Sequence, residues 1–232
     1  MFTLENISTY YRNLEAVKGI SLRVAHREMV SLVGANGAGK STVLRTACGL
    51  LRPKKGNIFF KDEEITYLKT AGRVKKGIVY CPEGRKLFPD MTVMENLEMG
   101  GFLCNDRFSS NLKRVFDLFP VLQERKGQKV ASLSGGQQQM VAIGRTLMSG
   151  PEMILFDEPS TGLAPIVVAG LMEVIKRLNE EGMSILLVEQ NVNFALEISH
   201  RGYVLENGNI VLEGTVDALK HNSRVKESYL GG

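Results

Sequence analysis

The spacing of hydrophobic and polar positions predicts strands at the start of the chain. Phe2 and Leu4 alternate with polar residues, as in a strand with one buried face. Ser21–Val24 and Glu28–Val33 follow as further strand segments, and Met29–Val33 is almost entirely apolar. A strand of that composition is typical of a parallel sheet, in which both faces of a strand are buried. The chain is therefore expected to enter a parallel sheet near residue 30.

A glycine-rich segment, Gly34–Lys40, follows this strand directly. The next residues, Ser41–Gly49, have the pattern of a helix. Asn57–Phe60 and Gly77–Tyr80 are short strand candidates, separated by a basic stretch that we predict to be helical. A strand, a glycine-rich turn and a helix thus succeed one another near the N-terminal end of the predicted core.

The pattern changes to that of helices between Thr92 and about Leu133. Thr92 and Glu95 match a capping box, in which each residue bonds the backbone of the other at a helix start. Apolar residues then recur at helical spacing as far as Pro120. A second helix is predicted after Ser134, with Met140, Ile143 and Leu147 on its buried side.

Alternation of strands and helices resumes near residue 150. Met153–Phe156 and Ile185–Val188 are predicted to be buried strands, with a helix between them that ends near Gly182. Tyr203–Leu205 and Ile210–Leu212 form a predicted hairpin around Asn207-Gly208. We therefore expect one α/β domain over 1–232, with a core from approximately 1–90 and 151–232 and a helical insert over approximately 91–150.

The composition is that of a globular protein. Apolar residues make up 44% and charged residues 23%, which excludes a disordered tail, a collagen-like fibre and a disulfide-knotted secreted peptide. Uninterrupted apolar runs reach only four residues, whereas a membrane span needs about twenty. The first residues have neither the basic nor the apolar region of a signal peptide.

Cysteine content and net charge bear on the cellular compartment and on the binding partners. Cys48, Cys81 and Cys104 are odd in number and lack CxxC spacing, so we expect reduced thiols in a cytosolic protein. The net charge of +4 is too small to indicate nucleic-acid binding. Such mild basicity would equally suit a protein that lies against an anionic membrane surface.

The segment from Gly34 to Ser41 matches the phosphate-loop pattern G-x-x-x-x-G-K-[ST] in full. Its glycines let successive backbone N–H groups point at phosphate oxygens, and the following helix adds its dipole. Lys40 can reach the β- and γ-phosphates, and the Ser41 hydroxyl can bind Mg²⁺. The residues expected to hold the nucleotide here are Gly34, Asn36, Gly37, Ala38, Gly39, Lys40, Ser41 and Thr42.

Two carboxylates, Asp157 and Glu158, end the apolar strand Met153–Phe156. Open α/β sheets bind ligands at the carboxyl ends of their strands. Together with a phosphate loop, this arrangement predicts that Asp157 lies near the magnesium ion and that Glu158 orients or deprotonates the attacking water.

A second glycine-containing helix start is Ser134-Gly135-Gly136-Gln137. Ser134 and Gln137 fit a capping box, but a good cap has no need of two glycines, which are poor helix formers. Their exposed N–H groups would suit a bulky anion. We therefore expect this helix start to face the nucleotide that a partner chain holds.

These motifs together resemble those of ABC-type ATPases. Leu133-Ser-Gly-Gly-Gln137 resembles the family signature, and the chain is most similar to LivF-like ATP-binding subunits of branched-chain amino acid importers. The segments that support this resemblance are Cys81-Pro-Glu-Gly-Arg85, Ser160-Thr-Gly-Leu-Ala-Pro165, Val188-Glu-Gln-Asn191, Arg201-Gly-Tyr-Val-Leu-Glu-Asn-Gly208 and Ser228-Tyr-Leu-Gly-Gly232.

The resemblance implies a fold and a set of partners. The fold is a P-loop NTPase of the ABC type, with an N-terminal antiparallel β subdomain, a RecA-like α/β core and an inserted α-helical subdomain. The implied activity is hydrolysis of ATP with Mg²⁺, with the nucleotide between two subunits that are identical or different. The implied partners are integral-membrane permeases and, indirectly, an external solute-binding protein. The resemblance therefore implies a location on the cytoplasmic face of the membrane and no nucleic-acid partner.

Four positions take their expected roles from the resemblance. Tyr11 matches the aromatic residue that stacks on adenine. Glu83 replaces a glutamine that contacts Mg²⁺ and senses the permease, and Gln190 replaces a histidine that contacts the γ-phosphate. An amide can donate a hydrogen bond but cannot carry a positive charge. Ala164 replaces an aspartate that ends the loop after Glu158.

Two alternative functions remain. A soluble ABC ATPase of translation or DNA repair usually has two cassettes or a long coiled-coil insertion, and this sequence has neither. A P-loop kinase would need an acceptor site and would have no use for Leu133–Gln137. The transported solute is left open, because its recognition lies in other chains.

Overall fold

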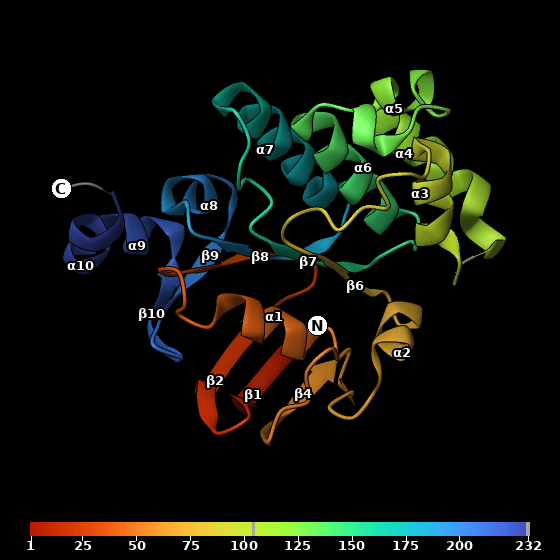
Figure 1. The fold of residues 1–232 in the computed structure, drawn as a ribbon. Coiled ribbons are helices and arrows are strands. Elements are labelled where there is room, and N and C mark those ends of the chain that lie inside the picture. Colours follow the sequence, from red (N-terminus) through yellow and green to blue (C-terminus); the bar gives the residue numbers. More distant parts are fainter. Residues whose placement is uncertain (104, 231–232) are drawn as a thin grey trace.

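Two β-sheets with helices around them form the protein (Figure 1). The computed structural model describes residues 1–103 and 105–230, without the side chains of residues 105, 229 and 230. Cys104 and the last two residues of the C-terminal motif therefore lie outside the described residues. The α/β class and the ABC-type cassette fold are confirmed, and helices occupy much of residues 93–147.

The smaller sheet has four strands in the order β2-β1-β4-β5 and is antiparallel. Phe2 of β1 pairs with Val24 of β2 on one side and with Phe60 of β4 on the other, and all three side chains are buried. The alternation at Phe2 and Leu4 thus predicted this strand, although β1 extends further, to Tyr11. The strands are β1 (Phe2–Tyr11), β2 (Leu14–Val24), β4 (Lys55–Phe60) and β5 (Glu63–Glu64).

The larger sheet has six strands in the order β10-β9-β3-β8-β7-β6. Five of these strands run parallel to one another, and β10 pairs with β9 in the antiparallel direction. The carboxyl ends of the parallel strands therefore meet at one edge, where open α/β sheets bind ligands. All residues of β3, β7 and β8 are buried, as their apolar composition predicted. The strands are β3 (Met29–Val33), β6 (Ile78–Cys81), β7 (Met153–Asp157), β8 (Ser184–Glu189), β9 (Arg201–Glu206) and β10 (Asn209–Thr215).

Helices cover both faces of the larger sheet. In Figure 1, α1 lies between this sheet and the small sheet, whereas α3 to α8 lie on the opposite face. The helices are α1 (Lys40–Ala47), α2 (Thr70–Lys75), α3 (Val93–Gly101), α4 (Phe108–Leu118), α5 (Pro120–Glu124), α6 (Gly135–Leu147), α7 (Pro165–Glu180), α8 (Val192–Ile198), α9 (Val216–His221) and α10 (Ser223–Val225). Shorter turns of helix are η1 (Asn105–Arg107), η2 (Val130–Ser132) and η3 (Lys226–Leu230).

The predicted hairpin and capping boxes are present. Asn207 and Gly208 join β9 to β10 with φ of 48° and 82°, as a two-residue hairpin turn requires. The boxes at Thr92 and Ser134 begin α3 and α6. Sequence analysis missed α8 and α9, which are only seven and six residues long and so give little periodic signal.

A buried arginine links the C-terminal end of α1 to the segment that follows the small sheet. Arg73 of α2 is 1% exposed, and its guanidinium donates to five backbone carbonyls at 2.7–2.9 Å. Two of these belong to Thr46 and Ala47 at the C-terminal end of α1, where helix carbonyls lack partners. The acceptors are the carbonyl oxygens of Thr46, Ala47, Ile65, Thr66 and Leu68.

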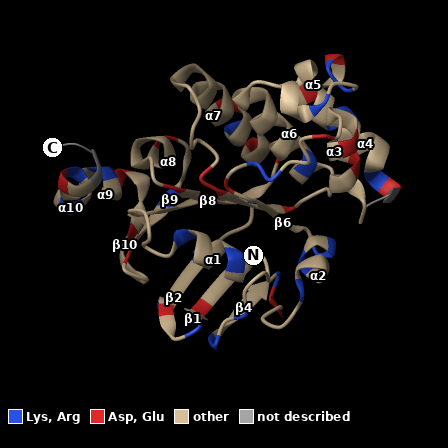
Figure 2. Cartoon of the chain, in the orientation of Figure 1, with Lys and Arg blue, Asp and Glu red and all other residues tan. Residues whose placement is uncertain are grey.

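The surface carries charges of both signs. In Figure 2, lysine and arginine are interspersed with aspartate and glutamate on most elements, in keeping with the small net charge. Among the residues that the structure describes, no helix combines the length and apolar character needed to cross a bilayer.

Candidate functional site

A cleft of about 510 Å³ opens at the carboxyl edge of the larger sheet. It brings together most of the predicted site residues, from the small sheet, the phosphate loop and the ends of two central strands. Those present are Tyr11, Asn36, Gly37, Gly39, Lys40, Ser41, Thr42, Glu83, Glu158 and Gln190. Sequence analysis did not identify the other three lining residues, Leu14, Ala16 and Thr161.

The phosphate loop wraps around the side chain of its own lysine. Lys40 Nζ donates to the carbonyl oxygens of Gly34 at 2.8 Å and Ala35 at 3.1 Å. Gly39 caps α1 with a φ of 109°, and a Cβ there would lie 2.7 Å from the carbonyl oxygen of Ala16. Only glycine fits this backbone conformation and this contact, which explains the motif's last glycine.

Asp157 is held by two hydroxyl groups. Its Oδ1 accepts a hydrogen bond from Ser41 Oγ at 3.0 Å, and its Oδ2 accepts one from the Tyr80 hydroxyl at 2.7 Å. Burial raises the pKa of Asp157 above its usual range, against the effect of these two hydrogen bonds. Burial also raises the pKa of Tyr80, so its hydroxyl stays protonated and donates. Tyr80 is a partner that sequence analysis did not predict.

Glu158 adopts an unusual backbone conformation. Its φ is 46°, which is rare for a residue other than glycine. Its N–H donates to the carbonyl oxygen of Val188 on β8 at 2.9 Å. Its carboxylate forms an ion pair with Lys40 at 3.1 Å and accepts a hydrogen bond from Thr161 Oγ1 at 3.3 Å. The carboxylate therefore points into the cleft, where a γ-phosphate bound by Lys40 would lie.

The loop after β8 contributes Gln190 and a buried carboxylate beside it. Glu189 is 1% exposed, and it accepts hydrogen bonds from Ser160 N at 3.0 Å and Ser160 Oγ at 2.9 Å. Burial, with a smaller contribution from the charge of Glu158, raises the pKa of Glu189 to about 7. Glu189 was not predicted as a site residue, because in sequence it is only the last residue of an apolar strand.

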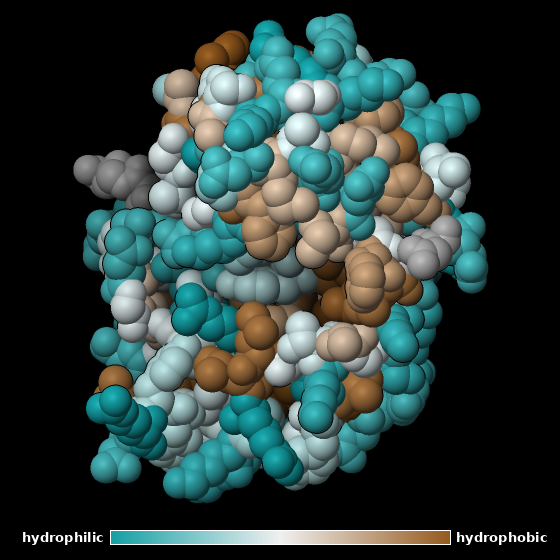
Figure 3. Space-filling view, turned by 45° about the vertical axis from the view of Figure 1, so that its right-hand side comes forward, coloured by the Kyte–Doolittle hydropathy of each residue, from teal (hydrophilic) through white to brown (hydrophobic). Residues whose placement is uncertain are grey.

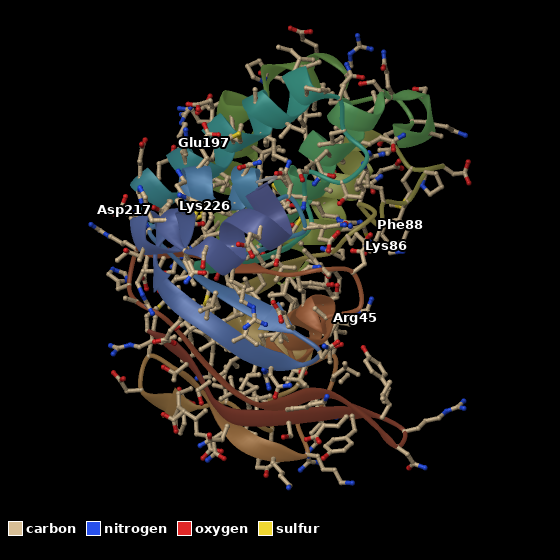
Figure 4. All side chains as sticks on the ribbon, turned by 90° about the vertical axis from the view of Figure 1, so that its left-hand side faces the viewer. Arg45, Lys86, Phe88, Glu197, Asp217 and Lys226 are labelled. Carbon is tan, nitrogen blue, oxygen red and sulfur yellow. The ribbon has the colours of Figure 1, made fainter. Side chains whose placement is uncertain are left out.

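The aromatic end of the cleft is formed by Tyr11 at the end of β1. Tyr11 is 40% exposed, and its hydroxyl oxygen accepts a hydrogen bond from Arg45 Nη1 of α1 at 3.5 Å. Figure 4 labels Arg45 on α1, with Lys86 and Phe88 above it on the loop that follows β6. A flat, half-exposed ring at the mouth of a phosphate-loop cleft suits stacking on a purine base.

Glu83 stands at the start of a strained loop. The next three residues, Gly84, Arg85 and Lys86, have φ of 69°, 63° and 46°. Arg85 Nη1 donates to Gln138 Oε1 of α6 at 3.2 Å, and Arg145 of α6 donates to the Arg85 carbonyl oxygen at 3.0 Å. The loop therefore joins the cleft directly to α6.

The helix start at Ser134–Gln137 does not reach this cleft. Its capping box is formed, and Gly136 is closely packed within the chain. A Cβ on Gly136 would lie 2.9 Å from Val167 of α7, and one on Gly135 would lie 3.3 Å from Arg85 Nη2. At the start of α7, Ala164 occupies the N-cap without a side-chain acceptor, where an aspartate could have capped the helix.

A groove of about 440 Å³ lies beside the loop that follows Glu83; we call it the α3 groove. Three of its lining residues, Phe88, Met99 and Phe102, are large hydrophobic residues that are 45%, 49% and 75% exposed. Figure 3 shows hydrophobic side chains around a hollow on this side of the molecule. A concentrated apolar surface of this kind is typical of a protein-binding site.

The described residues offer few ligands for a metal on their own. Among them, no group of three or more His, Cys, Asp or Glu side chains could hold an ion. Cys48 and Cys81 are buried thiols, and burial raises the pKa of each to about 11.

Known proteins with related sequences are nucleotide-dependent transport subunits. A family model described as ABC transporter matches residues 17–161. The chain is 47% identical to the high-affinity branched-chain amino acid transport ATP-binding protein BraG of Pseudomonas aeruginosa, with both chains covered completely. It is 32% identical to the lipopolysaccharide export system ATP-binding protein LptB of Escherichia coli, over 99% of this chain and 96% of LptB. It is 31% identical to the probable branched-chain amino acid transport ATP-binding protein LivF of Archaeoglobus fulgidus, over 100% and 99%.

Solved structures show the same fold. A nucleotide-free ATP-binding cassette from an ABC transporter superposes with a TM-score of 0.87 at 28% identity, over 100% of this chain and 99% of the cassette. A dimeric ATP-binding cassette in a post-hydrolysis state, bound to ADP and Pi, superposes with a TM-score of 0.82 at 28% identity, over 93% and 99%.

Proposed function

The chain belongs to the ABC transporter family, and from this membership we propose that its ATP hydrolysis drives an importer of branched-chain amino acids. The observation that supports these solutes is the 47% identity to BraG over the whole of both chains. ATP binding and hydrolysis are properties of the family to which the chain belongs. LptB, an export-system subunit, is less similar at 32% identity.

In the bound state that we propose, ATP lies along the cleft with adenine on Tyr11. The phosphates lie on the backbone of Gly34 to Thr42, with Lys40 at the β- and γ-phosphates. The presence of the partly exposed Tyr11 and of the phosphate loop in the lining of one cleft supports this orientation. Gln190, in the same cleft, then lies where its amide can donate to the γ-phosphate.

The residues beside the phosphate loop fit a hard divalent cation such as Mg²⁺. The Ser41 hydroxyl can bind the ion directly, together with phosphate oxygens. Asp157 already accepts from Ser41 and Tyr80, so we propose that it orients Ser41 and metal-bound water. Glu83 offers a further oxygen at the cleft, and direct contact with the ion remains its predicted role. When bound, the ion offsets the charge that develops on the phosphates.

Hydrolysis follows from an exchange of partners at Lys40. In the resting arrangement Glu158 is ion-paired with Lys40 and cannot serve as a free base. A γ-phosphate competes for the same ammonium group, so ATP binding releases the Glu158 carboxylate towards the attacking water. Glu158 then accepts a proton from that water, while Lys40 stabilises the charge of the phosphoryl group.

A second ATPase subunit completes the site in this proposal. The signature residues Ser134, Gly135, Gly136 and Gln137 lie outside the chain's own cleft, which leaves them available to the nucleotide of a partner. The dimeric cassette bound to ADP and Pi supports such an arrangement. Either a second copy of this chain or a related, non-identical subunit could supply the opposite half.

The α3 groove is our proposed contact with an integral-membrane permease, on the cytoplasmic face of the membrane. Its exposed apolar side chains lie beside the loop that begins at Glu83 and bonds α6. We propose that the helical segment over approximately 91–150 moves as a unit on ATP binding and pulls on a permease helix seated there. An external solute-binding protein would deliver the amino acid.

The test is transport by the assembled complex. With its permeases and binding protein in proteoliposomes, the wild-type chain should take up leucine with hydrolysis of ATP. Lys40→Ala should abolish uptake and strongly weaken ATP binding by calorimetry, since it removes the ammonium group of the phosphate loop. Equal ATP affinity in both proteins would overturn the nucleotide site. Uptake of a different solute class would overturn only the choice of substrate.

A further inference from the structure

The turn that follows β7 is bonded to the end of β8 by a single buried carboxylate. Glu189 is the last residue of β8, and its two oxygens accept from the backbone N–H and the hydroxyl of Ser160 at 3.0 and 2.9 Å. Ser160 lies two residues after Glu158. The buried carboxylate thus holds the segment that carries the proposed catalytic base.

Glu158 needs such support because its backbone is strained. A non-glycine residue with a φ of 46° persists only where surrounding contacts determine its conformation. Three contacts surround it: its own N–H bonds Val188, the N–H of Thr161 bonds its carbonyl oxygen at 3.2 Å, and Glu189 holds Ser160. Of these three contacts on the backbone segment, the Glu189 contact is the one made by a charged side chain, whereas Lys40 pairs with the Glu158 carboxylate itself.

The carboxylate is also placed between the elements of the nucleotide site. Glu189 pairs with Val33, the residue before the phosphate loop, and it precedes Gln190. It is almost completely buried, and its pKa is raised by that burial and by the charge of Glu158. A buried carboxyl is costly unless it is hydrogen-bonded, so its two bonds to Ser160 are strongly favoured.

We propose that Glu189 is a positioning residue for ATP hydrolysis, which fixes the direction of the Glu158 carboxylate through Ser160 and ties it to Gln190. Glu189 does not itself line the nucleotide cleft. Without it, the turn from Glu158 to Thr161 loses two anchors, and Glu158 can relax out of its left-handed conformation. Turnover would fall, whereas the phosphate loop stays intact and ATP binding is not weakened.

The test compares Glu189→Ala with the conservative Glu189→Gln in the assembled transporter. Glu189→Ala should lower kcat at least tenfold, with a calorimetric Kd for ATP no more than twofold above that of wild type. Glu189→Gln keeps one acceptor oxygen and should recover most of the lost kcat. A kcat within twofold of wild type in Glu189→Ala, or no recovery in Glu189→Gln, would overturn the proposal.

A second variant changes the other partner of the hydrogen bond, and it keeps the proposal testable if Glu189→Ala does not fold. Ser160→Ala removes the hydroxyl without touching the buried carboxyl. It should lower kcat by less than Glu189→Ala does, because the bond from the Ser160 N–H remains. The double variant Glu189→Ala/Ser160→Ala should be no slower than Glu189→Ala, because that substitution already removes the hydroxyl contact. If the effects of the two substitutions on kcat multiply in the double variant, the proposed coupling between Glu189 and Ser160 is refuted.

The proposal rests on the role of Glu158 in the proposed function, and the two can fail separately. If Glu158→Gln retains turnover, the assignment of the base is wrong. If Glu158→Gln is inactive but Glu189→Ala turns over normally, only the positioning role is wrong.

Discussion

The ion pair between Lys40 and Glu158 leads to a prediction with two opposite effects. Glu158→Gln keeps the shape of the side chain but removes its charge. It should abolish turnover and, at the same time, tighten ATP binding. Tighter binding is expected because ATP must compete with the Glu158 carboxylate for the Lys40 ammonium group in the wild-type chain.

The size of the binding effect follows from the geometry. The two side chains are 4% and 10% exposed, and Nζ lies 3.1 Å from Oε1. At an effective dielectric constant of about 20, Coulomb's law gives roughly 5 kcal/mol for this separation. Phosphate oxygens replace Glu158 as partners of Lys40, so most of that energy is recovered. We expect a net gain of about 1.4–2.7 kcal/mol, or ten- to hundredfold in Kd.

The turnover effect is set by the loss of a general base. Base catalysis typically contributes about 10²–10⁴-fold, so kcat should fall by at least about a hundredfold. A residual rate within threefold of wild type would exclude Glu158 as the base.

Calorimetric titration with ATP and Mg²⁺ measures the affinity, and phosphate release measures the turnover. Glu197→Gln is a matched control, since Glu197 is exposed on α8, away from the cleft (Figure 4). The control should match wild type in both measurements. Unchanged or weaker ATP binding in Glu158→Gln would refute competition at Lys40, whatever happens to turnover.

Three further predictions concern other residues. Gln190→Ala should lower turnover more than ATP affinity. Gln190→His should be active, and its turnover should depend on pH between about 5.5 and 7.5, where a histidine titrates. Wild-type turnover in Gln190→Ala would show that Gln190 has no role in hydrolysis. Arg73→Met should lower the free energy of unfolding, measured by urea denaturation, by about 3–5 kcal/mol, because five carbonyls lose a charged donor. The control Arg23→Met, at an exposed position, should lower it by less than about 0.5 kcal/mol. Equal losses in the two variants would contradict this prediction. In a variant lacking Cys104, native Cys48 and Cys81 should resist a thiol reagent at pH 8, and rapid labelling would show that they are not buried.

The sequence by itself was sufficient for several local features that a short stretch of chain encodes. The phosphate loop needs glycines and a lysine at fixed spacing, and the buried parallel strands need continuous apolar runs, so both were readable before the structure. The helix caps at Thr92 and Ser134 and the turn at Asn207-Gly208 are equally local. Their physical causes act between residues that are close in the sequence and therefore also close in space.

Only the tertiary structure decided which distant groups meet. Tyr80 bonds Asp157 across 77 positions, Glu189 bonds Ser160 across 29, and Glu158 is paired with Lys40. Nothing in the pattern around Tyr80 or Glu189 marks them, since each lies in an ordinary apolar strand. Their partners are set by the register of neighbouring parallel strands, which aligns residues that the chain separates by whole helices. Burial at that shared edge then makes each polar contact strong enough to hold the site.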